Sequence, residues 1–578
     1  MKKILQKLST LWAFLFYCLC AVGFTWPLTL HLKTHIIGGM GDNIYFVWLV
    51  RWYQKAFLEG GGHPFFAPHL NYPQGWNLST TETSLTSTLP GVPFSLLWGP
   101  IAGYNLAMLL TFVLAGFFMY LWIKDLTRSN TAALLAGFLF SFSPYHISHF
   151  VVGHLNLCGI QWFPLFFWGL QRLLRADKRF DLKFALLSGL SLAAIAFTSM
   201  YYLYMSLIFG VLFGLLMLLF TRFAAFKNKH FWLNLGLALL VSLPFLFYAL
   251  RPFINLAQAG TLASRPIEYA AMYSASPTDF ILPATDHFLW GAAANRGFDR
   301  SLWNESSLYL GCVTLILAVA PLIRNKKSQH RPLIWSAFIL VLISLLLALG
   351  INLHWNNQPV TWHLPAFLQP LFNKSETLVY LPAAWLFNHL PFFDKMRTIM
   401  RFAVFALFLL PLLAGLGVQL LETRLTRGWR AAIAVALFAL AFLDLYPGTY
   451  AANLTCPAPR AVDAWLAQQP GSGAVVQLPI QESSDQAQVY YTLFHQKPFL
   501  GGDFNANQPQ QWTEIQPVLA AFPDEHSIQR LQLLGVEFMV VDQAAYADDP
   551  TFVQTIDQYG LILLTEQDGQ AVYTFSAP

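Results

Sequence analysis

Long apolar runs are the feature that most constrains the fold of this chain. Runs of about 20 residues recur up to residue 446, and each could cross a hydrocarbon core of roughly 30 Å as a helix. The sequence is 56% hydrophobic and 11% charged, whereas a soluble domain carries about 25% charged residues. Such a chain cannot cover a water-facing surface with polar side chains. The sequence therefore predicts a polytopic α-helical membrane protein.

We expect about eleven spans, with candidate runs at 9–30, 102–123, 130–144, 157–171, 184–200, 202–221, 231–250, 307–323, 333–350, 400–421 and 431–446. Short cytoplasmic loops collect Lys and Arg. With the N-terminus inside, twenty of the 34 basic residues fall in the inner segments 2–7, 124–128, 172–183, 222–229, 324–331 and 424–430. This alternation predicts a multi-pass plasma (inner) membrane protein with a cytoplasmic N-terminus.

The same topology leaves long outer segments at 31–101, 251–306 and 351–399, and a tail from 447 onward. From Tyr446 to Pro578 acidic residues outnumber basic ones fourteen to three, and no run is long enough to span. "GAVVQLPI" and "VEFMVVD" indicate strands, "DQAQVYYTLFHQ" and "EHSIQRLQLLG" indicate helices, and "LILLTEQDGQAVYTF" indicates a hairpin. We therefore predict a transmembrane domain over 1–446 and a soluble extracytoplasmic α/β domain over 447–578.

Two classes of site are not indicated. The five cysteines have no metal-ligand spacing and fall mostly in or beside apolar runs, so neither a disulfide framework nor a zinc site is expected. The net charge of +5 is explained by the inner loops. It therefore predicts no nucleic-acid partner.

One acidic residue stands out at the start of the first outer segment, in "GGMGDNIYFVWLVRWYQKAF". Trp48 and Trp52 recur at helical spacing, which predicts an amphipathic helix over 43–57 in the membrane interface, with Asp42 at its N-cap. Capping alone stabilises a helix by about 1 kcal/mol. The alternative is a carboxylate that faces a ligand, because glycines 38, 39 and 41 would leave the backbone open to one.

Several motifs along the chain resemble those of a known family. They are "GDNIYFVWLVRW", "YPQGWN", "FSPYHISHFVVGHLNL", "NESSLYLG", "MRTIMRF", "HQKPFLGGDF" and "LGVEFMVVD". With the retained first span and the tail, they resemble the GT-C superfamily of integral-membrane glycosyltransferases. More closely, the chain is similar to the uncharacterised bacterial membrane proteins related to YfhO.

This resemblance implies a GT-C fold and a function. It implies that Asp42 is the catalytic base and that the donor is a polyprenyl-phosphate sugar. A hexosyl or pentosyl group would pass to an extracytoplasmic glycan, lipid or protein acceptor at the outer membrane face. Many family members carry a second acidic residue beside the first, but Asn43 stands in its place here. We therefore expect no divalent metal.

The departing lipid phosphate needs cations, and Arg makes charge-assisted contacts to phosphate oxygens. Arg397 and Arg401 in "KMRTIMRF" lie four apart, which predicts one helix face at the outer end of a span. Interfacial snorkelling is the alternative for both. Arg265 is a further candidate for the donor phosphate.

The remaining candidates are for substrate binding. His146 and His149 share a predicted helix face near His154, but no carboxylate accompanies them in the sequence, so hydrogen bonding to sugar or a structural role is expected rather than a metal. Glu305 precedes a span. Its negative charge would either be favoured there by the helix dipole, or the side chain would orient a substrate. The expected substrate-binding residues are His146, His149, His154, Glu305, Trp48 and Trp52.

Two other functions stay open. A lipid or polysaccharide transporter is one, although most runs lack the mid-span ionisable groups that coupled transporters carry, and no inverted repeat is visible. A non-catalytic membrane scaffold whose tail binds partners is the other, because a fold does not fix a function.

Overall fold

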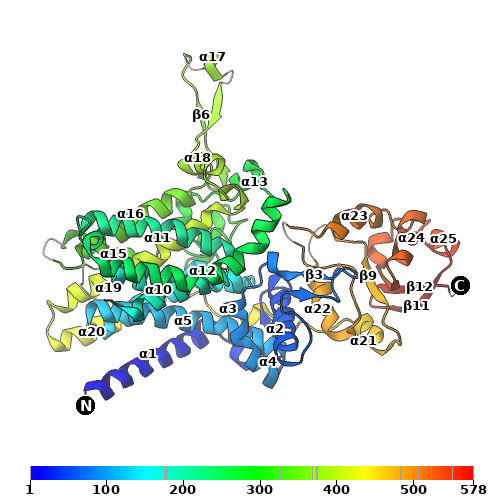
Figure 1. Cartoon of the computed structure of the whole chain (residues 1–578), viewed down its shortest axis with the longest axis horizontal. Helices are drawn as coiled ribbons and strands as arrows, with labels where there is room; N and C mark the ends of the chain where they lie inside the picture. Colours follow the sequence, from blue (N-terminus) through cyan, green and yellow to red (C-terminus); the bar gives the residue numbers. More distant parts are fainter. Residues whose placement is uncertain are drawn as a thin grey trace.

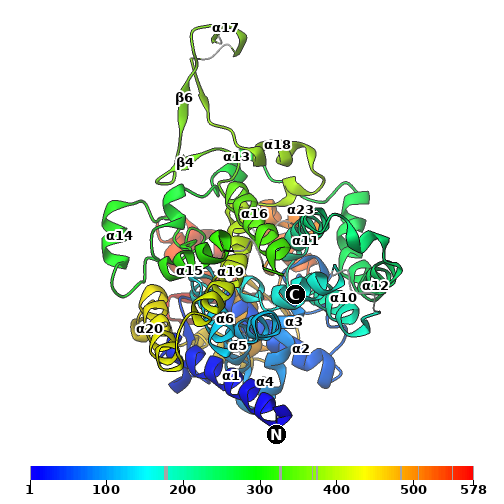
Figure 2. The ribbon, with the colours of Figure 1, turned by 90° about the vertical axis from the view of Figure 1, so that its left-hand side faces the viewer.

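The computed structural model describes residues 2–174, 180–324, 328–367, 369–372, 375–481, 485–504, 507–549 and 551–576. Parts of the predicted inner segments 172–183 and 324–331 lie outside these ranges. Figure 1 shows a bundle of roughly parallel helices with the N-terminus at one end and the C-terminal segment at the other. Figure 2 views the bundle from its N-terminal end.

Every predicted run contains an apolar helix. These are α1 (Lys2–Phe24), α5 (Pro100–Thr127), α6 (Asn130–Ser141), α9 (Trp162–Leu173), α10 (Leu182–Ala196), α11 (Met200–Phe220), α12 (Lys229–Gln258), α15 (Cys312–Ile323), α16 (Arg331–Ala348), α19 (Val404–Glu422) and α20 (Arg427–Leu445). Among the described residues, six helical stretches are long and apolar enough to cross a membrane: Pro100–Thr127, Met200–Phe220, Lys229–Gln258, Arg331–Ala348, Ile399–Glu422 and Gly428–Leu445. The protein is thus a multi-pass helical membrane protein, and the count of eleven spans stays a prediction.

The helices differ in how much of their surface the protein itself covers. The span that contains α19 is 83% buried, whereas α12 and α20 are buried over only 22% and 11% of their most apolar stretches. Aromatic rings stack around α19, for example those of Phe209 and Phe405, whose centroids lie 4.3 Å apart. The helix α19 is therefore central, and the apolar sides of α12 and α20 are left for lipid.

The first outer segment folds into β1 (Ile36–Ile37), α2 (Asp42–Leu58), β2 (Phe66–Ala67), β3 (Trp76–Asn77), α3 (Leu85–Thr88) and α4 (Val92–Trp98). The prediction that α2 lies in the membrane interface is wrong. Its residues from Asn43 to Val50 are all buried, because α4 and α5 pack on the helix from the bundle and α22 (Gln486–His495) packs on it from the tail.

The tail contains the predicted strands and helices. Its sheet has the order β11 (Leu561–Gln567), β12 (Gln570–Phe575), β10 (Val536–Asp542), β9 (Ala474–Leu478), with β9 and β10 parallel and the other pairs antiparallel. Asp568 and Gly569 turn the β11–β12 hairpin with φ values of 51° and 75°. A two-residue hairpin turn of this kind requires positive φ at both positions, which is why Asp-Gly predicts it. Helices α21 (Ala461–Gln468), α23 (Gln510–Leu519), α24 (Glu525–Leu533) and α25 (Phe552–Gln558) complete the segment.

The tail is docked on the first outer segment through the backbone. Strand β8 (Leu454–Thr455) pairs with β1. The backbone N–H of Phe499 donates to the carbonyl of His69 at 2.8 Å, and that of Asn71 donates to Gly501 at 2.9 Å. These contacts place α22 beside the start of α2. The boundary at residue 447 as that of a separate domain stays a prediction.

The start of α2 is also held from the bundle side, by the turn between α7 (Pro144–Val151) and α8 (Leu155–Cys158). Gly153 in this turn has a φ of +83°, and a Cβ there would lie 2.5 Å from both the Cβ and the backbone nitrogen of Asn43. Gly38 is packed in the same way, since its Cβ would lie 2.0 Å from the carbonyl oxygen of Val151. The expectation that Gly38 leaves the backbone open to a ligand is therefore wrong.

Replacing Gly153 by Ala should destabilise the protein, because the new methyl group requires a left-handed backbone and pushes α2 away. We expect a loss of about 1–3 kcal/mol, seen as a lower melting temperature in detergent. The matched control is Gly214→Ala in α11, where nothing lies within 4 Å of the added Cβ. The control should melt at or above the wild-type temperature. Equal melting of Gly153→Ala and wild type would contradict this account of the turn.

Candidate active site

One large cavity opens where the bundle meets the first outer segment. Its volume is about 1210 Å³, and it is walled by the start of α2, the loop before α3, the start of α8, helices α11 and α12, and the chain that leads into α19. The charged or titratable side chains on its wall are Asp42, His63, Glu82, His154, Tyr201, Tyr204, Tyr248, Arg251, Arg265, Lys395, Arg397 and Arg401. Residues far apart in the sequence, predicted as base and as donor-phosphate ligands, thus share one cavity.

Asp42 faces this cavity and does not cap α2. The N-cap is Gly41, with no side-chain cap bond. Instead the side-chain oxygen of Asn43 accepts hydrogen bonds from the backbone N–H groups of Gly41 at 3.0 Å and Ile44 at 2.9 Å. The expected capping role of Asp42 is therefore wrong. Its carboxylate is 42% exposed and lies 3.2 Å from Nε2 of His154, and it accepts a 3.1 Å hydrogen bond from Gln486.

The surroundings keep the Asp42 carboxyl ionised. Burial raises the pKa of Asp42, but the hydrogen bond from His154 and the charges of Arg397 and Arg401 outweigh burial and lower the pKa below its usual value. At neutral pH the group is thus a carboxylate, which can accept hydrogen bonds or a proton.

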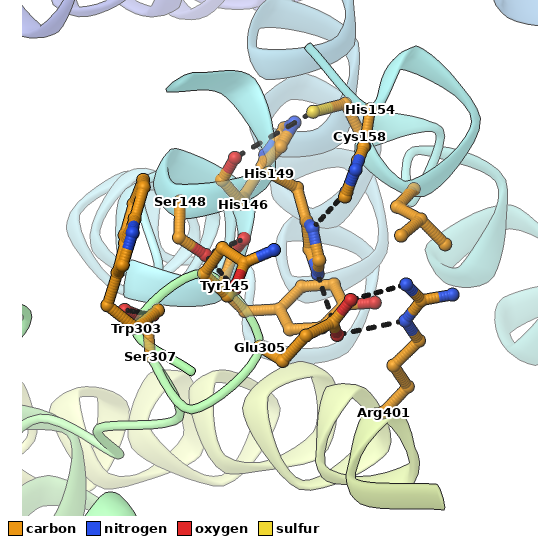
Figure 3. Close-up of polar contacts among 12 residues, drawn as sticks. Tyr145, His146, Ser148, His149, His154, Cys158, Trp303, Glu305, Ser307 and Arg401 are labelled. Carbon is orange, nitrogen blue, oxygen red and sulfur yellow. Dashed lines mark hydrogen bonds and ion pairs between the residues drawn. The ribbon is translucent and has the colours of Figure 1, made fainter. Parts of the chain in front are cut away.

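A chain of polar side chains leads from Asp42 into the protein, and Figure 3 shows its part from His154 to Arg401. The Nδ1 atoms of His154 and His149 lie 2.9 Å apart, so one of the two carries a hydrogen and donates a hydrogen bond to the other. Nε2 of His149 lies 3.9 Å from a Glu305 carboxylate oxygen. Glu305 in turn accepts two hydrogen bonds from the guanidinium of Arg401, one of them from Nε at 2.9 Å. The chain therefore joins the cavity wall to a buried ion pair.

The Glu305–Arg401 pair is almost completely shielded from solvent, since the two side chains are 3% and 6% exposed. Burial raises the pKa of Glu305, yet the charge and hydrogen bonds of Arg401 prevail and lower it to about 2. Helix α15 begins only at Cys312, so the expected role of Glu305 as an N-terminal helix charge is wrong. Its partner is a side chain from the start of another span.

His149, His154 and Glu305 bring ligand atoms within 4.8 Å of one another, which is a spacing that a metal ion could use. The sequence-based statement that no carboxylate accompanies the histidines is thus wrong. The group nevertheless fits a cation poorly. Both oxygens of Glu305 are engaged by the Arg401 guanidinium, and the facing nitrogens of the two histidines are engaged with each other. We assign no metal to this site.

The other predicted phosphate ligands also lie on the cavity wall. Arg397 precedes the 3₁₀ turn Ile399–Ala403, which contains Arg401, so the prediction that both arginines share one helix face is wrong. The Arg397 guanidinium lies over the ring of Tyr273, with 5.4 Å between its central carbon and the ring centroid. Arg265 reaches the cavity from the loop before α13 (Ile267–Ala271). Neither arginine has an ion pair among the described residues.

Three predicted substrate-binding residues lie elsewhere. The ring of His146 is fully buried, stacks on Phe112 with centroids 3.9 Å apart, and hydrogen-bonds to Thr111 and to the carbonyl of Ser141. Trp48 and Trp52 stack in parallel inside the protein, 1% and 3% exposed. These three residues are not part of the cavity wall.

The structure also adds residues that the sequence analysis missed. Glu82 lies on the cavity wall, and burial raises its pKa. Asp503 of the tail is 4% exposed, and burial together with the negative charge of Asp42 raises its pKa to about 8. Glu82 is the only acid in the polar strip "WNLSTTETSLTST", which was a usable signal. Asp503 and Gln486 come near Asp42 only because the tail folds back, which no local pattern shows.

Solved structures of other proteins have a similar fold. The chain is similar to arabinofuranosyltransferase AftD from Mycobacteria (TM-score 0.55, 14% identity), with 98% of this chain and 41% of AftD covered. A weaker similarity is to oligosaccharyltransferase AglB from Archaeoglobus fulgidus (TM-score 0.47, 14% identity), with 99% of this chain and 74% of AglB covered. Another is to ArnT from Cupriavidus metallidurans (TM-score 0.41, 12% identity), with 97% of this chain and 97% of ArnT covered. All three are GT-C glycosyltransferases. We infer the fold from the similarity to AftD, and at 14% identity this similarity concerns the fold alone.

The match covers only 41% of the length of AftD. No curated protein matches the sequence. The closer resemblance to YfhO-like proteins stays a prediction. A family model, described as Domain of unknown function (DUF6311), matches residues 54–376. Because this range is more than half of the chain, the protein belongs to the DUF6311 family.

Proposed function

We propose that this protein is a GT-C glycosyltransferase that transfers a hexosyl or pentosyl group from a polyprenyl-phosphate donor to an extracytoplasmic glycan, lipid or protein. The observation that carries the proposal is the single cavity that joins the Asp42 carboxylate to Arg397 and Arg401. We place the cavity at the outer face of the plasma (inner) membrane, because the basic loops fall on the opposite side in the predicted topology.

The donor fits the cavity in two parts. Arg265, Lys395 and Arg397 supply cations for the phosphate, and Arg is suited to bidentate contacts with its oxygens. The apolar part of the wall comes from α11 and α12, including Leu203, Leu207, Leu250, Phe253 and Ile254. Since α12 is mostly uncovered by protein, a prenyl chain in this part of the cavity can extend into lipid.

The proposed reaction uses the two ends of the cavity. The Asp42 carboxylate takes the proton from an acceptor hydroxyl, whose oxygen then bonds to the anomeric carbon of the sugar. The bond from that carbon to the phosphate oxygen breaks, and its electron pair leaves with the lipid phosphate. The arginines stabilise the charge that develops there. A positioned base of this kind contributes typically about 10²- to 10⁴-fold.

The histidines and Glu305 act on Asp42 and not on the sugar in this proposal. With Asp42 ionised, His154 donates from Nε2 to the carboxylate and accepts at Nδ1 from His149. Nε2 of His149 lies 3.9 Å from Glu305, beyond hydrogen-bond distance, so in this proposal the His149 ring is placed by its packing beside the Glu305–Arg401 pair, and the two histidines orient the Asp42 carboxylate. His149, His154 and Glu305 are therefore positioning residues.

The tail supplies the acceptor side. Gln486 donates to Asp42, and Asn507 lies on the cavity wall. An acceptor hydroxyl that reaches Asp42 therefore passes close to tail residues. We propose that the C-terminal segment positions the acceptor.

Asp42→Asn should lower turnover by about 10² to 10⁴, because an amide cannot take a proton from a sugar hydroxyl at neutral pH. Turnover is measured with radiolabelled polyprenyl-phosphate sugar and a cell-envelope acceptor. The melting temperature should stay near that of wild type, since Asp42 does not cap α2. The control is Asp548→Asn, an exposed tail position away from the cavity.

A wild-type rate for Asp42→Asn would show that the base lies elsewhere. If neither wild type nor control turned over the donor but reconstituted protein moved it across vesicles, the transporter alternative would replace the enzyme.

Arg397→Gln should raise the Michaelis constant for the donor about tenfold or more, because it removes a charge-assisted contact to phosphate. Arg397 is a better probe than Arg401, whose loss would strand the buried Glu305 charge and destabilise the fold. Arg296→Gln on α14 (Gly291–Gly297), exposed and outside the cavity wall, is the control. Unchanged donor kinetics in Arg397→Gln would leave that residue as an interfacial anchor.

A further inference from the structure

The described residues between 351 and 392 form an arm that projects from the bundle. It contains β4 (His354–Trp355), β5 (Gln358–Pro359), β6 (Thr361–His363), α17 (Gln369–Phe372), β7 (Glu376–Leu378) and α18 (Pro382–His389). Strands β6 and β7 pair as an antiparallel hairpin. Figures 1 and 2 both show this hairpin standing away from the rest of the molecule.

The arm exposes large aromatic side chains. Trp355, Trp362, Phe367, Tyr380 and Trp385, here called the aromatic surface, are each more than half exposed. The sequence of the arm has only one lysine, Lys374, and one glutamate, Glu376, and no arginine or aspartate. A segment with this composition exposes apolar area without the charges that usually keep such area soluble.

Within the part of the chain that the structure describes, no protein layer packs on strand β6 of the hairpin. All three residues of β6 are exposed, and an isolated two-stranded hairpin is marginally stable in water. Among its described residues, the ion pair across the hairpin joins His363 to Glu376, whose side chains are 82% and 46% exposed. A surface-exposed pair contributes little. The arm therefore needs another surface to support it.

The position of the arm identifies that surface. It begins just after α16, which ends at Ala348, and it leads back to the span that starts at Ile399. Both ends of the arm thus join candidate spans on the same side of the bundle. Figure 1 shows the hairpin running across the direction of the bundle helices. An arm with this direction would run along the surface of a membrane that the bundle helices cross.

We propose that the aromatic surface of the arm rests in the interfacial layer of the membrane, between headgroups and acyl chains. Trp and Tyr favour this layer because their rings are apolar at one end and polar at the other. Since the arm has so few charges, its binding depends on the aromatic side chains and not on anionic lipid.

Anchoring the arm has a consequence for the cavity. The chain continues from α18 through Phe392 to Lys395 and Arg397, all of which lie on the cavity wall. An arm seated in the interface holds these cations near the level of lipid phosphates. This consequence rests on the proposed function, whereas the anchoring itself does not.

The test places a fluorophore on the arm of the full-length protein in phosphatidylcholine nanodiscs. Trp362→Cys in a variant without the five native cysteines is labelled with an environment-sensitive dye. The matched control is Leu563→Cys, a similarly exposed apolar residue on strand β11 of the tail (54% and 49%). Quenching is measured with lipid spin-labelled near the headgroup and, separately, with iodide in water.

We expect the label at residue 362 to lose about half its fluorescence to the spin-labelled lipid and to be protected from iodide, and the label at 563 to behave in the opposite way. Adding phosphatidylglycerol should change neither result. Phe367→Cys provides a second site if the first variant folds poorly. Equal iodide quenching at both sites, or lipid quenching that requires anionic lipid, would overturn the proposal. Because no donor turnover is measured, the result is independent of the proposed enzyme activity.

Discussion

The buried ion pair between Glu305 and Arg401 is the contact on which the arrangement of the site depends. Two charges taken out of water are tolerated only when they satisfy each other, and here both guanidinium contacts go to one carboxylate. The pair fastens the loop before α15 to the start of α19. His149 and His154 extend it to Asp42. Removal of either charged partner would cost about 3–5 kcal/mol, because the other charge would remain buried alone.

Much of the architecture follows from local sequence. Apolar length predicts the bundle helices, and the strands and the Asp-Gly turn of the tail follow from short-range pattern. The roles around α2 do not. Asn43, which replaces the expected second acid, takes over the capping bonds, and that leaves the Asp42 carboxylate free to face the cavity. Trp48 and Trp52 look like interfacial residues in the sequence, yet both are buried and lie against His69 of the same outer segment.

The histidines show where pattern reasoning ends. His146 and His149 have the same helical setting, yet His146 hydrogen-bonds to Thr111 and Ser141 in the bundle whereas His149 joins the chain to Glu305. The deciding contacts come from partners distant in the sequence, such as Arg401 for Glu305. The placement of Asp42 and Arg397 in one cavity agrees with what the family resemblance implies, but spacing alone could not predict it.

The acidic groups near Asp42 explain how one carboxylate can remain charged there. Asp503 is buried nearby and Glu82 lies on the same cavity wall, and neighbouring carboxylates disfavour one another's ionisation. The pKa of Asp503 is raised to about 8 by burial and by Asp42, so Asp503 is mostly protonated at neutral pH. The pKa of Asp42 is lowered, since only Asp42 has both the His154 hydrogen bond and the nearby arginines to offset burial. Neighbouring carboxyl groups with separated pKa values are typical of sites that divide acid and base roles. Arg397, which would hold the donor phosphate, therefore also helps to keep the proposed base ionised, so binding of an anionic donor would partly offset the charge of Arg397 and make Asp42 a stronger base when the donor is present.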